Sequence, residues 1–150
     1  MKTLIVGKNS FLSKNLSINN TTKISHKDLD NVDIDKFDRL FLISFPPIYK
    51  KKKEKIFLFE KKLLDRFFDK KILYFSTQKV YPYKLNCNET DETLPDSIYA
   101  ENKMCIEKLI LERTNKFQIF RVSSVFSSTK YSEESFFSQL RKKWNFESQI

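Results

Sequence analysis

Short apolar runs alternate along the chain with segments in which apolar residues recur at helical spacing. The apolar runs predict strands at 3–6, 21–25, 40–45, 71–76 and 117–122. The helical spacing predicts helices at about 11–19, 49–70, 98–114 and 132–146. Because strands and helices alternate, the pattern predicts an α/β fold with a mostly parallel sheet that helices cover on both faces. The strand residues expected in its core are Leu4, Ile5, Val6, Leu42, Leu73 and Ile119.

The helix expected at 49–70 has a wide apolar face. The residues on or beside that face are Ile56, Phe57, Phe59, Leu63, Leu64, Phe67 and Phe68. A face of this width could pack on the sheet and also on a second subunit. The pattern is therefore compatible with self-association through this helix.

The length and composition indicate one globular domain. The chain has 150 residues, of which 40% are apolar, and this supports a packed core. No apolar run approaches the roughly 20 residues of a membrane-spanning helix, and the first apolar run is too short for a signal peptide. Cys87 and Cys105 are the only cysteines. We interpret them as free thiols in a reducing cytoplasm, with a disulfide between them as the alternative. A cytoplasmic protein with no membrane partner is expected.

The net charge is +9, and a basic surface attracts polyanions such as nucleic acids. The alternative is a solvated, lysine-rich surface. The densest run, Lys50 to Lys53, leads into a predicted helix and is interpreted as its solvated first turns. The aromatic residues that follow have helical spacing, which is typical of a core face and not of a base-stacking platform. The pattern therefore argues against a nucleic-acid partner. His26 is the only histidine and is interpreted as a surface residue, so no histidine-based metal site is expected.

Tyr99 and Lys103 lie four residues apart in the helix expected at 98–114, so they share one helical face with Ile106 and Ile110. A tyrosine phenol has a pKa of about 10 and is a poor base at neutral pH. A nearby ammonium group favours the phenolate and lowers that pKa, so that the phenol can exchange a proton with a hydroxyl or carbonyl group. By itself, such a pair is more often two surface residues.

Three further motifs surround this pair at consistent positions. They are Gly7 to Ser13 after the first strand, Ser76 to Tyr81 after the fourth, and Arg121 to Phe126 at the end of the last. Together with Pro95 to Lys103, they resemble the extended short-chain dehydrogenase/reductase superfamily of nucleotide-sugar epimerases, dehydratases and reductases. The resemblance implies a Rossmann-type, doubly wound parallel sheet in three αβα layers, with residues 1–150 as its NAD(P)-binding domain.

The resemblance also implies a catalytic set. Tyr99 would be the general acid/base, Thr77 would hydrogen-bond the reacting sugar oxygen, and Lys103 would hold the nicotinamide ribose and tune Tyr99. The implied function is an NAD(P)-dependent epimerase or reductase that acts on a nucleotide sugar. By the same resemblance, the protein would be a homodimer through the helices at 49–70 and 98–114.

The implied cofactor is NAD or NADP. Gly7, Ser10, Phe11 and Leu12 would lie along its pyrophosphate, at the turn between the first strand and helix. Lys27 would meet a 2′-phosphate, and this favours NADP. Taken alone, the turn at 7–13 is equally typical of an ordinary strand–turn–helix connection.

Several positions depart from the superfamily pattern. Ser10 and Ser13 stand where the phosphate loop has glycines, and a left-handed serine at position 10 would cost about 1–2 kcal/mol. Gln78 and Lys79 replace an acidic pair of the dehydratases, which argues against dehydration.

The short stretch between the second and third strands predicts the loss of one strand and helix. The half of the superfamily that holds most of the sugar nucleotide lies beyond Ile150, so the domain is expected to be truncated, with weak cofactor binding and slow turnover. A non-catalytic nucleotide-binding or interaction module is the alternative.

Overall fold

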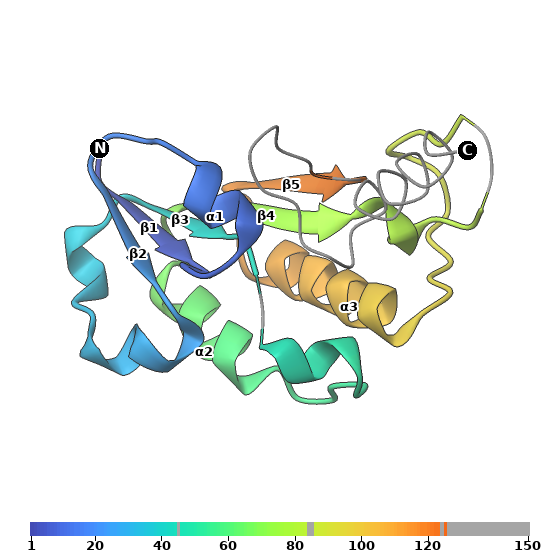
Figure 1. Cartoon of the computed structure of the whole chain (residues 1–150), viewed down its shortest axis with the longest axis horizontal. Helices are drawn as coiled ribbons and strands as arrows, with labels where there is room; N and C mark the ends of the chain where they lie inside the picture. Colours follow the sequence, from blue (N-terminus) through green and yellow to red (C-terminus); the bar gives the residue numbers. More distant parts are fainter. Residues whose placement is uncertain (45, 84–85, 124, 126–150) are drawn as a thin grey trace, which may run out of the picture.

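The structure is a computed structural model that describes residues 1–44, 46–83, 86–123 and 125. Its centre is a five-stranded, all-parallel sheet in the order β2-β1-β3-β4-β5 (Figure 1). The strands are β1 (Thr3–Val6), β2 (Thr21–Ile24), β3 (Arg39–Leu42), β4 (Lys71–Thr77) and β5 (Phe117–Val122). The prediction of a doubly wound parallel α/β sheet is confirmed.

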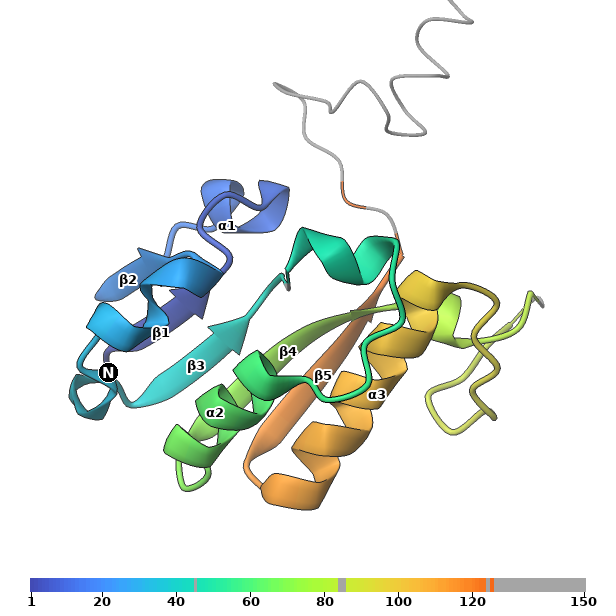
Figure 2. The ribbon, with the colours of Figure 1, turned by 90° about the horizontal axis from the view of Figure 1, so that it is seen from below.

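Helices lie on both faces of this sheet. Figure 2 shows α2 (Leu58–Arg66) and α3 (Ile98–Arg113) side by side on one face, while α1 (Phe11–Asn15) lies on the other face in Figure 1. The remaining helical elements are the short 3₁₀ turns η1 (His26–Asn31), η2 (Ile34–Lys36), η3 (Pro47–Lys50) and η4 (Gln78–Val80). The helix expected at 132–146 lies outside the described residues. The described residues include no helix that is long and apolar enough to cross a membrane.

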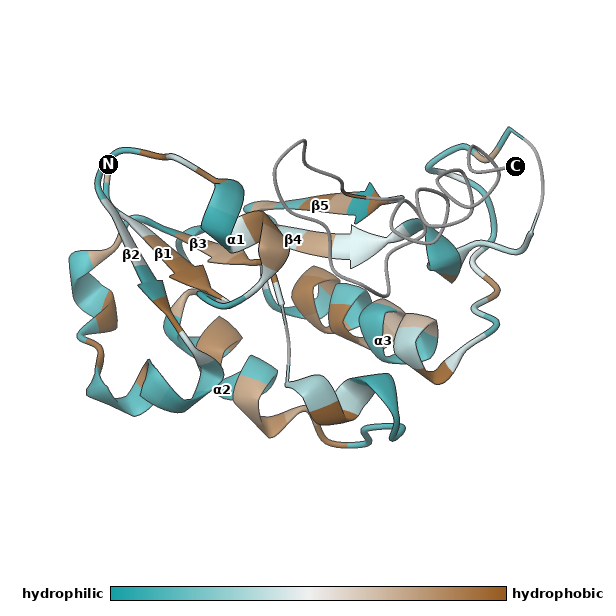
Figure 3. Ribbon diagram, in the orientation of Figure 1, coloured by the Kyte–Doolittle hydropathy of each residue, from teal (hydrophilic) through white to brown (hydrophobic). Residues whose placement is uncertain are grey.

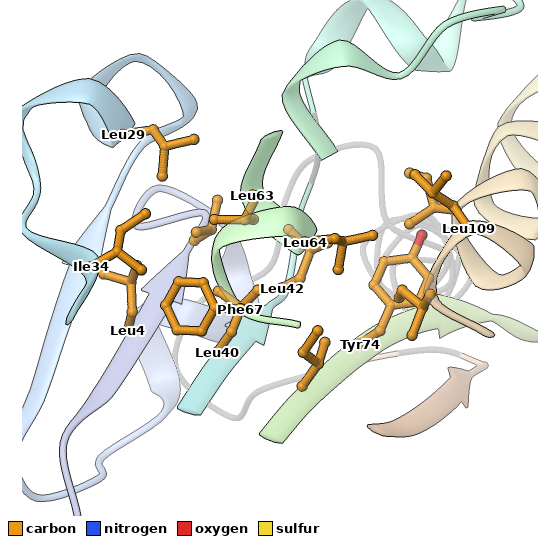
Figure 4. Packing of buried hydrophobic residues seen from close by; sticks show 14 of the residues in the cluster. Leu4, Leu29, Ile34, Leu40, Leu42, Leu63, Leu64, Phe67, Tyr74 and Leu109 are labelled. Atoms are coloured by element: carbon orange, nitrogen blue, oxygen red, sulfur yellow. The ribbon is translucent and has the colours of Figure 1, made fainter. Parts of the chain in front are cut away.

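The main core lies between the sheet and the α2–α3 layer (Figure 4). Strands β1 and β3 are the most hydrophobic part of the sheet, while the surrounding turns are mainly hydrophilic (Figure 3). A smaller core of Ile5, Phe41 and Ile43 faces α1. Four of the predicted core residues are fully buried: Leu4, Ile5, Val6 and Leu42. Leu73 and Ile119 are only partly buried, contrary to prediction. Leu73 faces the thinner α1 side, and Ile119 lies on the edge strand β5.

The prediction of a single helix at 49–70 is wrong, because the structure divides this segment into η3 and α2. The 3₁₀ turn η3 ends at Lys50, and α2 begins only after Phe57, which has a left-handed φ of 50°. Asn102 of α3 donates hydrogen bonds from its side-chain amide to the carbonyls of Tyr49 (2.8 Å) and Lys52 (2.9 Å). Its side-chain oxygen accepts from the Glu54 amide over 3.0 Å. These bonds use backbone groups that a continuous helix would need for itself.

The division of this helix also changes its surface. Lys51 to Lys53 are exposed in the turn before α2 instead of forming helical turns. Leu63 and Phe67 of the predicted apolar face are completely buried in the core, while Ile56 is exposed. The face that α2 leaves open to a partner is therefore narrower than the periodicity predicts.

The connection between β2 and β3 contains only η1 and η2, which bury Leu29 and Ile34 beneath the edge of the sheet. Every residue of this connection is described, and the connection contains no further strand and no α-helix. This agrees with the predicted loss of one strand and one helix between the second and third strands. The helix predicted at 11–19 is shorter than expected, because Leu16 takes an extended conformation directly after Asn15.

Candidate active site

The site lies where the sheet changes direction. Strand β1 pairs with β2 on one side and with β3 on the other, so a crevice forms at the carboxyl ends of β1 and β3. Gly7 follows β1 there with a φ of +111°, and its amide donates to the Ile24 carbonyl over 2.8 Å. A Cβ at this position would lie 2.3 Å from the Ser44 side-chain oxygen. Only glycine lets the ends of β1 and β3 approach this closely.

The turn after Gly7 is held by its own hydrogen bonds. The Ser10 amide donates to the Gly7 carbonyl over 2.9 Å, and the Ser10 hydroxyl accepts from the Ser13 amide over 3.1 Å. Ser10 has φ −69° and ψ 151°, so the left-handed conformation considered from the sequence is absent and serine is unstrained there. Ser13 is fully buried, and its hydroxyl has no partner among the described residues. Because its hydroxyl accepts the hydrogen bond from the Ser13 amide, Ser10 acts as the N-cap of α1.

The end of β2 carries an ion pair beside this turn. Lys8 binds Asp28 over 3.0 Å, and Asp28 also accepts hydrogen bonds from the amide (3.0 Å) and hydroxyl (2.9 Å) of Ser25. The Ser25 amide, followed by Lys8, lowers the pKa of Asp28 to about 2. Lys27 is exposed at the start of η1. This part of the crevice is polar and presents two lysines.

A small pocket of about 140 Å³ lies next to the crevice. Thr77, Tyr99 and Lys103 line it together with Leu12 from the first turn of α1. The structure therefore brings the predicted catalytic set together beside the carboxyl ends of β4 and β5. The other lining residues are Ile43, Phe75, Ser76, Val122, Ser123 and Val125. Gly7, Ser10, Phe11 and Lys27 are outside this lining.

Local structure positions each of the three polar residues. Thr77 ends β4, is buried, and accepts a hydrogen bond from the Lys79 amide over 3.3 Å. As a hydroxyl it keeps a proton that it can donate. Ser97 caps α3, because its hydroxyl accepts a hydrogen bond from the Ala100 amide over 3.3 Å. This cap sets Tyr99 in the first turn of α3 and Lys103 one turn later.

Burial is the main cause of the pKa shifts of Tyr99 and Lys103. Lys103 donates to the Phe75 carbonyl over 2.6 Å, and its nitrogen lies 4.7 Å from the centroid of the Tyr74 ring. Burial lowers the pKa of Lys103 to about 7, against the charges of Glu107 and Glu60. Burial also raises the pKa of Tyr99. The expectation that Lys103 lowers the pKa of Tyr99 is therefore wrong for this structure, in which desolvation dominates.

The sequence reading missed Glu60, which is completely buried in α2. Its hydrogen-bond partner is the Tyr49 hydroxyl at 3.0 Å. A signal was present, because Glu60 precedes Leu63, Leu64 and Phe67 by three, four and seven residues and so shares their buried face. The ion pair between Glu107 and Arg121, 2.7 Å long, was also not predicted from the sequence.

His26 is half-buried, so its interpretation as a surface residue is wrong. Its Nε2 atom lies 2.9 Å from the Ser44 carbonyl oxygen, and its ring meets Phe59 edge-on at 5.1 Å. Burial lowers its pKa. Neither Cys87 nor Cys105 forms a disulfide bond, as predicted. Within the described ranges no group of three or more His, Cys, Asp or Glu side chains is arranged to hold a metal ion.

A parallel sheet with a tyrosine–lysine pocket at its switch point defines the class of the extended short-chain dehydrogenases/reductases. The model of the RmlD substrate binding domain matches residues 66–149, more than half of the chain. The chain therefore belongs to the RmlD substrate binding domain family. No curated protein matches it significantly.

Solved structures share the fold at low sequence identity. A dTDP-4-dehydrorhamnose reductase from Clostridium acetobutylicum is 21% identical, with a TM-score of 0.73 over 97% of this chain and 60% of that one. The corresponding reductase from Bacillus anthracis, solved with NADP, is 19% identical, with a TM-score of 0.72 over 95% and 61% of the two chains. The UDP-glucuronic acid 4-epimerase from Bacillus cereus, solved with NAD, is 18% identical, with a TM-score of 0.70 over 95% of this chain and 62% of that one. The chain thus spans about 60% of the length of these proteins.

Proposed function

We propose that this chain is the dinucleotide-binding part of an NAD(P)-dependent enzyme that reduces or epimerises a nucleotide sugar. The observation that carries the proposal is the shared pocket of Thr77, Tyr99, Lys103 and Leu12 beside the switch point of the sheet. Membership of the family and the likeness to sugar-nucleotide reductases and epimerases support it. The cytoplasmic location and the absence of a nucleic-acid partner remain predictions from the sequence.

The crevice fits a dinucleotide at the turn after β1. Gly7 begins this turn at a position where a Cβ would clash with the Ser44 side chain, and Ser10, Phe11 and Leu12 would lie along the pyrophosphate. Lys27, exposed at the start of η1, would meet a 2′-phosphate, which favours NADP over NAD. When bound, the nicotinamide supplies or accepts a hydride.

The catalytic residues would act at the other end of the pocket. Lys103 would hold the nicotinamide ribose, and the Thr77 hydroxyl would orient the reacting sugar oxygen. Burial raises the pKa of Tyr99, which favours the protonated phenol, and a protonated phenol can donate a proton to a sugar oxygen.

The proposal is tested by titrating NADH and NADPH into the chain by calorimetry and then assaying dTDP-, UDP- and GDP-sugars. Tyr99→Phe is expected to keep dinucleotide binding and to lower turnover about 10²- to 10⁴-fold, the usual contribution of a general acid. Tyr83→Phe is the matched control, because Tyr83 is fully exposed. Failure of a folded chain to bind either dinucleotide would overturn the proposal.

A non-catalytic interaction module is the second candidate. The Ser13 amide, which a phosphate loop would offer to its ligand, is bonded by the Ser10 hydroxyl. At the end of β2, Lys8 and Asp28 are likewise bound to each other in an ion pair. These bonds support weak dinucleotide binding, because each contact that the ligand loses costs about tenfold in affinity per 1.4 kcal/mol. A homodimer through α2 and α3 is proposed for either candidate.

A further inference from the structure

Residues 48–56, here called the basic turn, lead from η3 towards α2 and take no part in the proposed site. Glu54 is the only acidic residue of the turn, and five lysines surround it, at positions 50–53 and 55. All five lysines are exposed. Two apolar side chains flank them, since Ile48 is 56% exposed and Ile56 is 53% exposed. The basic turn therefore presents positive charge and apolar surface together.

The conformation of the basic turn is fixed from α3. The side-chain amide of Asn102 donates hydrogen bonds to the carbonyls of Tyr49 (2.8 Å) and Lys52 (2.9 Å), and its oxygen accepts from the Glu54 amide (3.0 Å). The buried rings of Tyr49 and Phe57 meet edge-on at 5.5 Å, so the two ends of the turn lie together. Figures 1 and 2 show this teal segment on the outside of the α2–α3 layer. The lysines are thus held on a fixed backbone at the surface.

Most of the positive charge of the basic turn is not neutralised within the described residues. Lys53 pairs with Glu101 of α3 over 2.8 Å. The Glu54 carboxylate bends back onto the turn, where one oxygen accepts from the amides of Lys55 and Ile56, each over 3.0 Å. The ammonium groups of the other four lysines form no ion pair with any described residue. These four charges are available to an anionic partner.

The composition of the basic turn distinguishes between kinds of anionic partner. All of its basic residues are lysines, whereas protein interfaces and bidentate phosphate sites favour arginine. The aromatic residues of the segment, Tyr49 and Phe57, are buried, so neither ring is free to stack on a nucleic-acid base. Lysines beside exposed isoleucines instead match the surface of an anionic bilayer. Its headgroups attract ammonium groups, and its interface accepts apolar side chains.

We propose that the basic turn is a docking surface for a bilayer that carries anionic lipids. The four lysines without an ion pair contact the headgroup phosphates, while Ile48 and Ile56 enter the boundary between headgroups and acyl chains. Such a contact needs no spanning helix, so it is compatible with the described helices. It departs from the expectation of no membrane partner, which rested on the lack of a spanning run. It goes beyond the proposed function and does not depend on it.

The test is a titration of the full chain with vesicles of phosphatidylcholine alone and of an equal mixture of phosphatidylcholine and phosphatidylglycerol, followed by flotation. Binding is expected only to the mixed vesicles, and it should weaken as salt screens the attraction. Lys51→Gln combined with Lys52→Gln is expected to weaken binding roughly thirtyfold, which is about fivefold for each lysine. Lys14→Gln combined with Lys108→Gln is the matched control, because both lysines are exposed elsewhere and the net charge falls equally. The control should bind nearly as well as the wild type.

The apolar contribution is measured separately. Ile56→Gln is expected to weaken binding to the mixed vesicles about tenfold, because part of an isoleucine side chain no longer leaves water. The same variant should not change the attraction of the chain to duplex DNA, which depends on charge alone. Leu94→Gln is the control, because Leu94 is 63% exposed outside the basic turn. Thermal melting checks that every variant is folded, as expected for changes at exposed positions.

Failure of the folded chain to float with the mixed vesicles would overturn the proposal. Equal losses in the two double lysine variants would also overturn it, since they would assign the attraction to the net charge of +9 and not to the basic turn. Equal affinity for duplex DNA, together with no effect of Ile56→Gln, would indicate a general polyanion surface and refute the choice of a bilayer. The titration needs neither dinucleotide nor sugar, so its failure is distinct from failure of the proposed function.

Discussion

Lys103 donates a hydrogen bond to the main-chain carbonyl of Phe75 over 2.6 Å. This bond joins α3 to β4 two residues before Thr77, where the strand ends. The lysine is therefore positioned by the sheet as well as by its own helix.

The buried lysine predicts how stability depends on pH. The pKa of Lys103 is about 7 in the folded chain and ordinarily 10.5. Between these values the unfolded chain binds the extra proton, so this residue makes stability rise with pH across that window. Lys103→Met is expected to stabilise the chain at pH 6 by up to about 5 kcal/mol, the free energy that corresponds to the lowered pKa, and by progressively less toward pH 10.

Urea denaturation at pH 6 and at pH 9.5 measures this difference. Lys108→Met is the control, because Lys108 is exposed on the same helix. Parallel pH profiles for Lys103→Met and the wild type would contradict the burial of a lysine with a lowered pKa.

Gly7→Ala is expected to destabilise the chain by about 1–3 kcal/mol, the usual cost of a strained backbone position. The reasons are the positive φ and the Ser44 hydroxyl oxygen, 2.3 Å from the new methyl group. Adding Ser44→Ala should restore only part of the loss, since it removes the oxygen but not the strain at φ +111°. Thermal melting of the single and double variants checks this, and full stability of Gly7→Ala would disprove the tight approach of β1 and β3.

Asn102→Ala is expected to release the segment at 47–57 from α3. The variant loses three hydrogen bonds, to Tyr49, Lys52 and Glu54, at about 1 kcal/mol each. Hydrogen exchange should become faster in this segment while β1 and β3 stay protected. The exposed Asn115→Ala serves as the control. Unchanged exchange at 47–57 would show that other contacts hold the segment.

Self-association is expected to involve the exposed apolar residues at the ends of α2. Leu58 and Phe68 are 70% and 62% exposed. Because burying a leucine is worth about 1.5–3 kcal/mol, Leu58→Ser should weaken the dimer roughly ten- to a hundredfold. Leu94→Ser is the control, because Leu94 is 63% exposed in the segment before α3. Sedimentation measures both, and a monomeric wild type at high micromolar concentration would refute this prediction.

The sequence by itself determined the parallel sheet and the three polar residues Thr77, Tyr99 and Lys103 that line the pocket. Apolar runs such as 3–6 and 71–76 are local patterns, and their order along the chain restricts the sheet to a parallel one. Tyr99 and Lys103 share a helical face by spacing alone, and Thr77 follows directly from the end of its strand. These features survive in the structure because each depends on residues close together in the chain.

Only the tertiary structure decided the division of the helix at 49–70, the direction of the Tyr99 pKa shift and the burial of Glu60. Asn102 interrupts that helix from about 50 residues away, and no local periodicity contains such a bond. The pKa values of Tyr99 and Lys103 follow from desolvation, which depends on what the neighbouring elements cover. Spacing shows which side chains share a face, whereas the charge they carry depends on the packing of α2, α3 and β4 around them.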